Sequence, residues 1–241
     1  MSDPATNVKR MKLILVPGLW LDASSWDDVV PPLRAAGHDT YPVTLPGLES
    51  VDADRTGIGL ETHIDAVAAL IDSLDDKVVL VGHSGGGPVV HGATDRRPDR
   101  VTRVVYVDSG PGAEGFIVND SSAHDDVEMP LPPFSEFGEE ELRDFTPEGL
   151  DAFAARAIPS PSHAAIDPLH LHDERRYDVP VTIITSTFPR DDMLKMIADE
   201  HPYTGDLARI TDVSIVEVPT GHWPQFTKPV ELAQAILDAV G

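Results

Sequence analysis

Val79-Leu80-Val81-Gly82-His83-Ser84-Gly85-Gly86 is the stretch of sequence that decides the fold. The apolar run over residues 77–81 is typical of a strand buried on both faces, as in a parallel sheet. It leads directly into Gly-x-Ser-x-Gly, and a helical pattern over residues 85–95 follows. A strand, a tight turn and a helix in this order indicate a nucleophile elbow, which projects a serine Oγ above the sheet edge.

The glycines beside Ser84 have a steric role. So tight a turn forces a strained backbone conformation on the serine, and small neighbours let strand and helix approach without Cβ clashes. The N-terminus of the following helix favours negative charge that develops beside it. Ser84 is therefore the candidate nucleophile.

Short β-rich runs alternate with helical patterns on both sides of this motif. The alternation predicts an α/β fold with a mostly parallel sheet of about six strands flanked by helices. The expected strands are 11–16, 39–43, 77–81, 101–107, 181–185 and 213–218, and the expected helices include 60–74, 85–95, 192–199 and 230–240.

One segment, from about 112 to 176, breaks this alternation. It contains clustered prolines, an acidic run and two helical patches at 139–145 and 147–157. Because it lies between two core strands, we interpret it as an insertion within a single domain of residues 1–241. We expect it to form a lid over a site, with a solvated loop region as the alternative.

A second motif, Thr220-Gly221-His222-Trp223-Pro224, follows the last expected strand and precedes the last helix. A serine hydroxyl needs a nearby base at neutral pH, and histidine is the side chain suited to that task. His222 is the candidate base, because its loop is expected at the same sheet edge as Ser84.

The first strand ends in Val16-Pro17-Gly18-Leu19-Trp20. Acyl transfer requires two backbone N–H donors aimed at the developing oxyanion. We expect one from Gly85, the residue after the nucleophile, and the other from Leu19.

The acid that would orient His222 has more than one candidate. Asp108 ends the buried strand 101–107 at this edge, where an unpaired carboxylate would cost several kcal/mol. Asp191 and Asp192 follow strand 181–185 and could reach His222 only if their loop folds back. We favour Asp108 and keep Asp191 or Asp192 as the alternative; either preserves the chain order Ser, Asp, His.

With these motifs the chain resembles the α/β-hydrolase superfamily. Within it, the chain is similar to a branch of small esterases that includes plant methyl-salicylate esterases, hydroxynitrile lyases and pyrethroid-type carboxylesterases. The matching residues are Val16-Pro17-Gly18-Leu19-Trp20, Ser25-Trp26, Pro32-Leu33-Arg34-Ala35-Ala36-Gly37-His38, Leu45-Pro46-Gly47, the elbow and Gly221-His222-Trp223-Pro224. The likeness spans nearly all of the chain outside the insertion and implies the α/β-hydrolase fold.

The resemblance also implies roles for single residues. Ser84 would be the nucleophile, His222 the base, and Leu19 and Gly85 the oxyanion donors. The family's usual acid position falls on Phe188, which cannot serve, so the acid remains open between the aspartates named above.

The expected activity is hydrolysis of carboxylic esters of a small to medium apolar substrate through an acyl-enzyme, without a metal or cofactor. An apolar mouth is expected from five aromatic residues: Trp20, Trp223, Phe116, Phe134 and Phe137. Two alternatives remain open. One is a ligand-binding relative without turnover; the other is a hydroxynitrile lyase, whose extra lysine could only be Lys228.

Composition excludes several other classes of protein. The 241 residues include no cysteine, which excludes disulfide scaffolds, thiolate metal sites and a cysteine nucleophile. A formal charge of −23 argues against nucleic acid as a partner. No apolar run approaches the roughly 18 residues of a membrane span, and none reads as a signal peptide, so we expect a cytoplasmic protein. The expected partner is a small-molecule ester, and a homodimer is possible although it must overcome charge repulsion.

Overall fold

The computed structural model describes residues 10–119, 127–199 and 201–241. A six-stranded sheet has the order β2-β1-β3-β4-β7-β8, and all of its neighbouring pairs are parallel. The strands are β1 (Lys12–Val16), β2 (Asp39–Pro42), β3 (Val78–His83), β4 (Val101–Val107), β7 (Val181–Thr185) and β8 (Val213–Glu217). The predicted six-stranded parallel sheet is confirmed.

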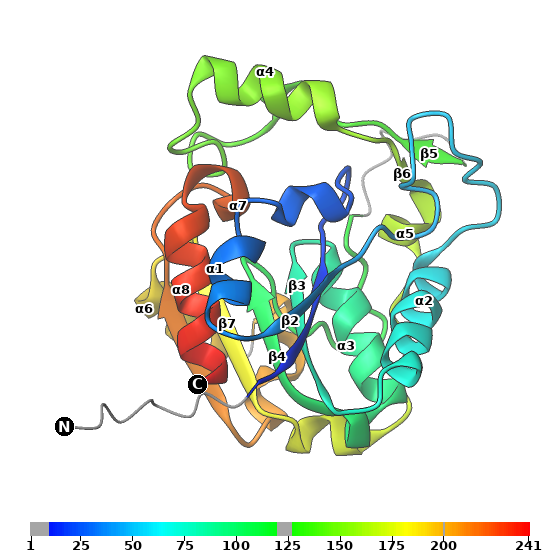
Figure 1. The fold of residues 1–241 in the computed structure, drawn as a ribbon, viewed down its shortest axis with the longest axis vertical. Helices are drawn as coiled ribbons and strands as arrows, with labels where there is room; N and C mark the ends of the chain where they lie inside the picture. Colours follow the sequence, from blue (N-terminus) through cyan, green and yellow to red (C-terminus); the bar gives the residue numbers. More distant parts are fainter. Residues whose placement is uncertain (1–9, 120–126, 200) are drawn as a thin grey trace.

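Helices cover both faces of this sheet (Figure 1). Helices α1 (Val30–Ala35) and α8 (Pro229–Val240) pack on one face, and α2 (Leu60–Ser73) and α3 (Gly86–Arg96) pack on the other. Shorter elements are η1 (Ala23–Trp26), η2 (Pro98–Arg100), α6 (Arg190–Ala198), η5 (Pro202–Arg209) and α7 (Pro224–Thr227). Strand β3 lies between β1 and β4 in the sheet, and the sheet lies between the two helical layers. All six residues of β3 are therefore buried.

Six short elements lie among the described residues between β4 and β7. These are β5 (Glu128–Met129), η3 (Phe134–Glu136), α4 (Pro147–Arg156), β6 (Ser160–Pro161), α5 (Ser162–Ile166) and η4 (Glu174–Asp178). Strands β5 and β6 form an antiparallel ribbon of their own. Helix α4 and this ribbon lie beyond the carboxyl ends of the central strands, on the same side as the turn from β3 to α3 (Figure 1).

One predicted helix of this segment is wrong. Residues 139–144 form successive turns rather than a helix, and Phe145 follows them without regular structure. The carbonyl of Glu141, which a helix would pair with the N–H of Phe145, instead accepts from the N–H of His222 at 2.8 Å, and Phe145 donates to Leu142. A contact with a distant loop thus replaces the local helical hydrogen bond.

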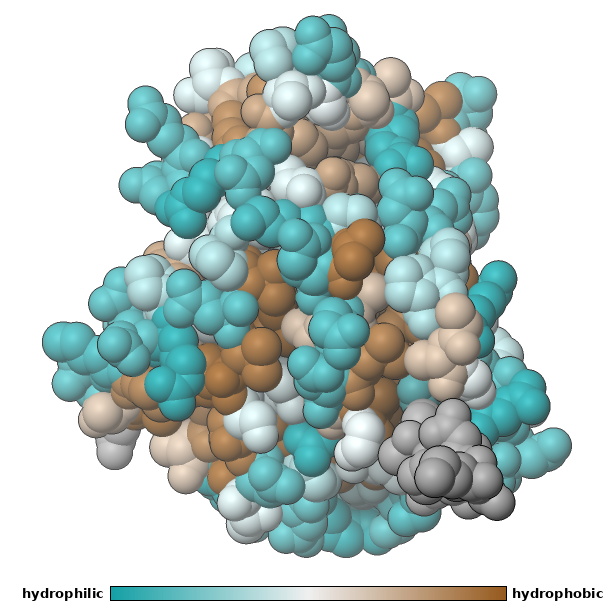
Figure 2. Space-filling model, turned by 60° about the vertical axis from the view of Figure 1, so that its left-hand side comes forward, coloured by the Kyte–Doolittle hydropathy of each residue, from teal (hydrophilic) through white to brown (hydrophobic). Residues whose placement is uncertain are grey.

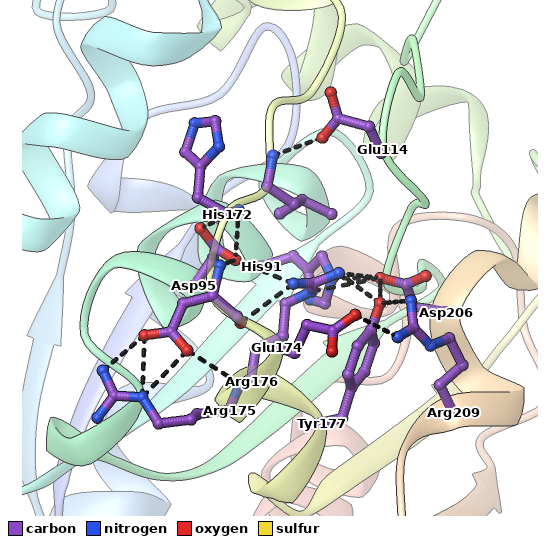
Figure 3. Close-up of polar contacts among 12 residues, drawn as sticks. His91, Asp95, Glu114, His172, Glu174, Arg175, Arg176, Tyr177, Asp206 and Arg209 are labelled. Carbon is purple, nitrogen blue, oxygen red and sulfur yellow. Dashed lines mark hydrogen bonds and ion pairs between the residues drawn. The ribbon is translucent and has the colours of Figure 1, made fainter.

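A buried polar network fastens the end of this segment to α3 (Figure 3). The Arg176 guanidinium lies 3.1 Å from the Asp95 carboxylate and 3.0 Å from that of Asp206. Asp95 also accepts from the backbone N–H groups of His172 and Asp173. Since Arg176, Asp95 and Asp206 are all buried, each charge depends on its partners.

The sheet ends on one side at β8, whose residues are half-buried or exposed. Figure 2 brings the side that carries α6 and α8 forward and shows hydrophobic patches interrupted by hydrophilic residues. Hydrophilic side chains beside an edge strand limit unwanted strand pairing.

In the described ranges, no helix is both long and apolar enough to cross a membrane.

Candidate active site

Ser84 lies in the turn between β3 and α3 with a φ of +49°, in the left-handed region. A Cβ on Gly82 would lie 2.7 Å from the carbonyl oxygen of Gly86, and one on Gly86 would lie 2.5 Å from that of Pro17. Both glycines are therefore required by the close approach of the turn to the neighbouring backbone. This is the strained, glycine-flanked turn that the motif predicts.

His222 follows β8 and lies between Ser84 and a carboxylate. Its Nε2 is 2.7 Å from the Ser84 Oγ, and its Nδ1 is 2.6 Å from Oδ2 of Asp108. The backbone of His222 is held on both sides: its N–H donates to Glu141, and its carbonyl lies 2.6 Å from Nε2 of His83. Two hydrogen bonds to the main chain thus fix the loop that presents the imidazole.

Asp108 directly follows β4, also with a positive φ of +43°. Its Oδ1 accepts from the N–H groups of Ser186 and Thr187, and its Oδ2 accepts from the Thr187 hydroxyl at 2.5 Å. Burial alone would raise the pKa of Asp108, but the hydrogen bond and charge of His222, with the bonds from Thr187, lower that pKa to about 2. The carboxylate is therefore ionised and fully hydrogen-bonded beside the imidazole.

The alternative aspartates lie elsewhere. Asp191 and Asp192 are exposed in the first turn of α6, where negative charge is favourable to the helix dipole. The carboxylate that hydrogen-bonds to His222 is that of Asp108. Phe188 follows β7 and is 42% exposed.

The backbones of Leu19 and Gly85 meet beside Ser84. A Cβ on Gly85 would lie 3.5 Å from the Leu19 nitrogen, and one on Gly18 would lie 2.9 Å from the Ser84 Cβ. Within the described part of the chain, no hydrogen bond joins either N–H to a protein acceptor. Two free donors next to the Ser84 hydroxyl are what an oxyanion hole requires.

An aromatic cluster adjoins His222. The Trp223 ring stands edge-on to the imidazole, with the two ring centroids 4.9 Å apart. The Phe137 ring contacts the rings of both Trp20 and Trp223. Phe134 belongs to the same cluster. Four of the five predicted mouth residues therefore lie together, two from core loops and two from the insertion.

The fifth residue, Phe116, lies elsewhere. It packs against the core beneath α2 and α3, and its ring lies 2.5 Å from where a Cβ of Gly112 would be. The backbone of the insertion pairs Phe116 with Leu169 there. Phe116 therefore lies outside the aromatic cluster of the other four residues, and its place in a substrate mouth stays a prediction.

Several residues at this site were not predicted from the sequence as contributors. Ser186 and Thr187 hold the Asp108 carboxylate; their place just after β7 was a usable signal, since parallel strands end at one edge. Phe153 is 2% exposed and packs on Trp223 at 5.0 Å, and its position inside a helical patch gave no such signal.

His83 was interpreted as a packing residue, and it is fully buried. Burial, and secondarily the charge of His222, lower the pKa of His83 to about 3, so its ring is neutral. The neutral ring donates from Nε2 to the His222 carbonyl.

No group of three His, Asp or Glu side chains among the described residues is arranged to hold a metal ion.

Comparison with known proteins agrees with this fold. The model of the Alpha/beta hydrolase family matches residues 13–235. A pyrethroid hydrolase from Sphingobium wenxiniae is 25% identical over 94% of this chain and 86% of its own. A carbendazim hydrolyzing esterase from a Nocardioides species is 36% identical, but the match covers only 40% of each chain.

A solved structure shares the fold over nearly the full length. An extracellular alpha/beta-hydrolase from a Paenibacillus species superposes with a TM-score of 0.77 and 22% identity, over 95% of this chain and 98% of that one. With the six-stranded sheet, the elbow and the family match over most of its length, the chain belongs to the alpha/beta hydrolase family.

Proposed function

We propose that the protein is a serine esterase that cleaves carboxylic esters through a triad of Ser84, His222 and Asp108. The observation that carries this proposal is one unbroken hydrogen-bond chain, 2.7 Å from the Ser84 Oγ to His222 and 2.6 Å from His222 to Asp108. Such a chain can deprotonate a serine during attack and stabilise the imidazolium that results.

The proposed reaction has two steps. The Ser84 Oγ adds to the ester carbonyl, its proton passes to Nε2 of His222, and the N–H groups of Leu19 and Gly85 receive the oxyanion. His222 then protonates the leaving alkoxide, which departs as an alcohol. Water, deprotonated by His222, attacks the acyl-enzyme carbonyl; the bond to the Ser84 Oγ then breaks, His222 returns the proton to that oxygen, and the acid is released.

The substrate class follows from the aromatic cluster. The partly buried rings of Phe134 and Phe137, packed on the buried Trp20 and Trp223, make the surroundings of the triad apolar, which suits a small to medium apolar ester. The segment of about 112–176 supplies two of these rings and is proposed as a lid within a single domain. The two relatives described above are named for hydrolysing a pyrethroid and carbendazim, which is consistent with an apolar substrate.

A hydroxynitrile lyase is a weaker alternative. Its additional lysine could only be Lys228, whose ammonium lies 3.8 Å from the Asp144 carboxylate. A ligand-binding relative without turnover would keep the same triad, so only catalysis distinguishes it from the esterase. The homodimer and the cytoplasmic location stay predictions.

The test is hydrolysis of a series of p-nitrophenyl esters from acetate to octanoate. We expect turnover by the wild-type protein, and a loss of kcat by at least about a thousandfold in Ser84→Ala and His222→Ala. A folded wild-type protein without turnover on the series and on matching methyl esters would contradict the esterase and favour the ligand-binding alternative.

A further inference from the structure

Trp20, the residue after the proposed oxyanion donor Leu19, is held by three hydrogen bonds, and all three partners lie in the insertion. Its N–H donates to the Ser160 Oγ at 2.7 Å, and its indole N–H donates to the Met129 carbonyl at 3.1 Å. Its carbonyl accepts from the N–H of Ile158 at 2.9 Å. The insertion therefore holds the backbone of the first loop directly.

These bonds hold Trp20 in an unfavourable conformation. Its φ is +65°, in the left-handed region that bulky side chains rarely adopt. Such a conformation persists only where the surroundings fix it. The Leu19 carbonyl and the Trp20 N–H belong to one peptide group. Because Ser160 binds this N–H, it fixes the plane of the peptide group and turns the Trp20 N–H towards the insertion.

The groups that bind Trp20 are themselves fixed. Ser160 and Met129 are opposite each other in the β5–β6 ribbon and are 0% and 3% exposed. The buried guanidinium of Arg55 donates to the Pro159 carbonyl at 2.7 Å, next to Ser160, and also contacts Glu128. The ribbon is thus also anchored to the loop between β2 and α2, which carries Arg55.

We propose that Ser160 is a positioning residue for the oxyanion hole. By binding the Trp20 N–H, its hydroxyl keeps the Leu19 N–H directed at the oxygen of the reacting carbonyl. The proposal rests on the esterase activity proposed above. It makes the insertion a part of the catalytic arrangement as well as a cover over the substrate.

The adjacent Ser162 provides a matched control. It is also 0% exposed and belongs to the same insertion, but its hydroxyl has no hydrogen-bond partner among the described residues. Loss of either hydroxyl removes one buried oxygen, yet only Ser160 touches the loop that carries Leu19. A difference between Ser160→Ala and Ser162→Ala therefore reports the bond to Trp20.

The experiment measures kcat and KM on a p-nitrophenyl ester and the affinity for a trifluoromethyl ketone, in both variants and the wild type. The ketone forms an oxyanion when the Ser84 Oγ adds to its carbonyl and the proton passes to His222, so its affinity depends on the oxyanion donors. In Ser160→Ala we expect kcat to fall about ten- to a hundredfold and the ketone to bind weaker by a similar factor, with KM within about twofold. The thiol of Ser160→Cys is a weaker hydrogen-bond acceptor than the hydroxyl. The kcat and the ketone affinity of this variant should therefore lie between those of the wild type and Ser160→Ala.

Thermal unfolding, followed by circular dichroism, shows whether each variant is folded. Unchanged kcat and ketone affinity in a folded Ser160→Ala, or equal losses in Ser162→Ala, would overturn the proposed role of Ser160. Those results leave the esterase proposal intact, since the wild type still turns over. A wild type that neither hydrolyses the ester nor binds the ketone would instead overturn the esterase and the role of Ser160 with it.

Discussion

At the scale of single residues, three residues that follow the carboxyl ends of β1, β3 and β4 have a left-handed backbone conformation. Trp20, Ser84 and Asp108 have φ values of +65°, +49° and +43°. Each such non-glycine residue costs on the order of 1–3 kcal/mol, and such costs concentrate at functional sites. Here these conformations occur where the chain leaves three neighbouring strands of the sheet, at the edge where His222 contacts Ser84 and Asp108.

Asp108→Asn tests the proposed acid. The amide oxygen can still accept from Ser186 and Thr187, so the fold should persist, but it cannot stabilise an imidazolium. We expect kcat on a p-nitrophenyl ester to fall by roughly a thousand- to ten-thousandfold.

The matched controls for this substitution are Asp191→Asn and Asp192→Asn, on the exposed first turn of α6. Both should retain kcat within about twofold. A severe loss in either of them, with little loss in Asp108→Asn, would place the acid on α6 instead.

At the scale of elements, the sequence was informative where burial alone decides the structure. The apolar runs of β1, β3, β4 and β7 are confirmed as strands because they lie between two helical layers. The elbow could be placed because its glycines and its serine occur between such a strand and a helix.

The insertion could not be derived in the same way. Strands β5 and β6 have two residues each, too few to show a period of two, and residues 130–159 separate them in the chain. Residues 139–145 had a helical pattern, but the Glu141 carbonyl binds the loop of His222. Long-range contacts that have no local signature therefore decide this part of the structure, including Phe116 and Ser160.

Gly221→Ala tests the contact between the insertion and the loop of His222. A Cβ on Gly221 would lie 2.3 Å from the Glu141 carbonyl oxygen and 2.7 Å from that of Arg143, so backbone must move. A displacement of His222 by about 1 Å can lower kcat on the order of a hundredfold. The measurement is kcat beside the unfolding midpoint; a folded variant with wild-type kcat would show that this contact does not position His222.

At the scale of the whole molecule, the network of Figure 3 joins α3, η4 and η5. Arg176→Met would leave Asp95 and Asp206 buried without their cation, which we expect to lower the free energy of unfolding by about 3–5 kcal/mol. The neighbouring Arg175, which pairs with Asp173 and Asp99 on the surface, is the control. Arg175→Met should cost less than about 1 kcal/mol, and equal losses in urea unfolding would contradict the distinction.

Four buried histidines predict how stability depends on pH. Burial lowers the pKa values of His38, His63, His83 and His91 below the ordinary value of 6.5. Below about pH 6.5 the unfolded chain binds protons at these positions that the folded chain does not, so the free energy of unfolding should fall as the pH decreases. Urea unfolding from pH 7.5 to 4.5 measures this slope, and a flat profile in that window would contradict it.

The most direct test of the account is the reaction of the protein with a fluorophosphonate, followed by intact mass. The Ser84 Oγ would attack phosphorus and expel fluoride, which adds one phosphonyl group to the chain. We predict a single adduct on the wild type that is absent in Ser84→Ala and forms far more slowly in His222→Ala. An unlabelled folded wild type, or labelling that persists in Ser84→Ala, would contradict the proposed activated serine.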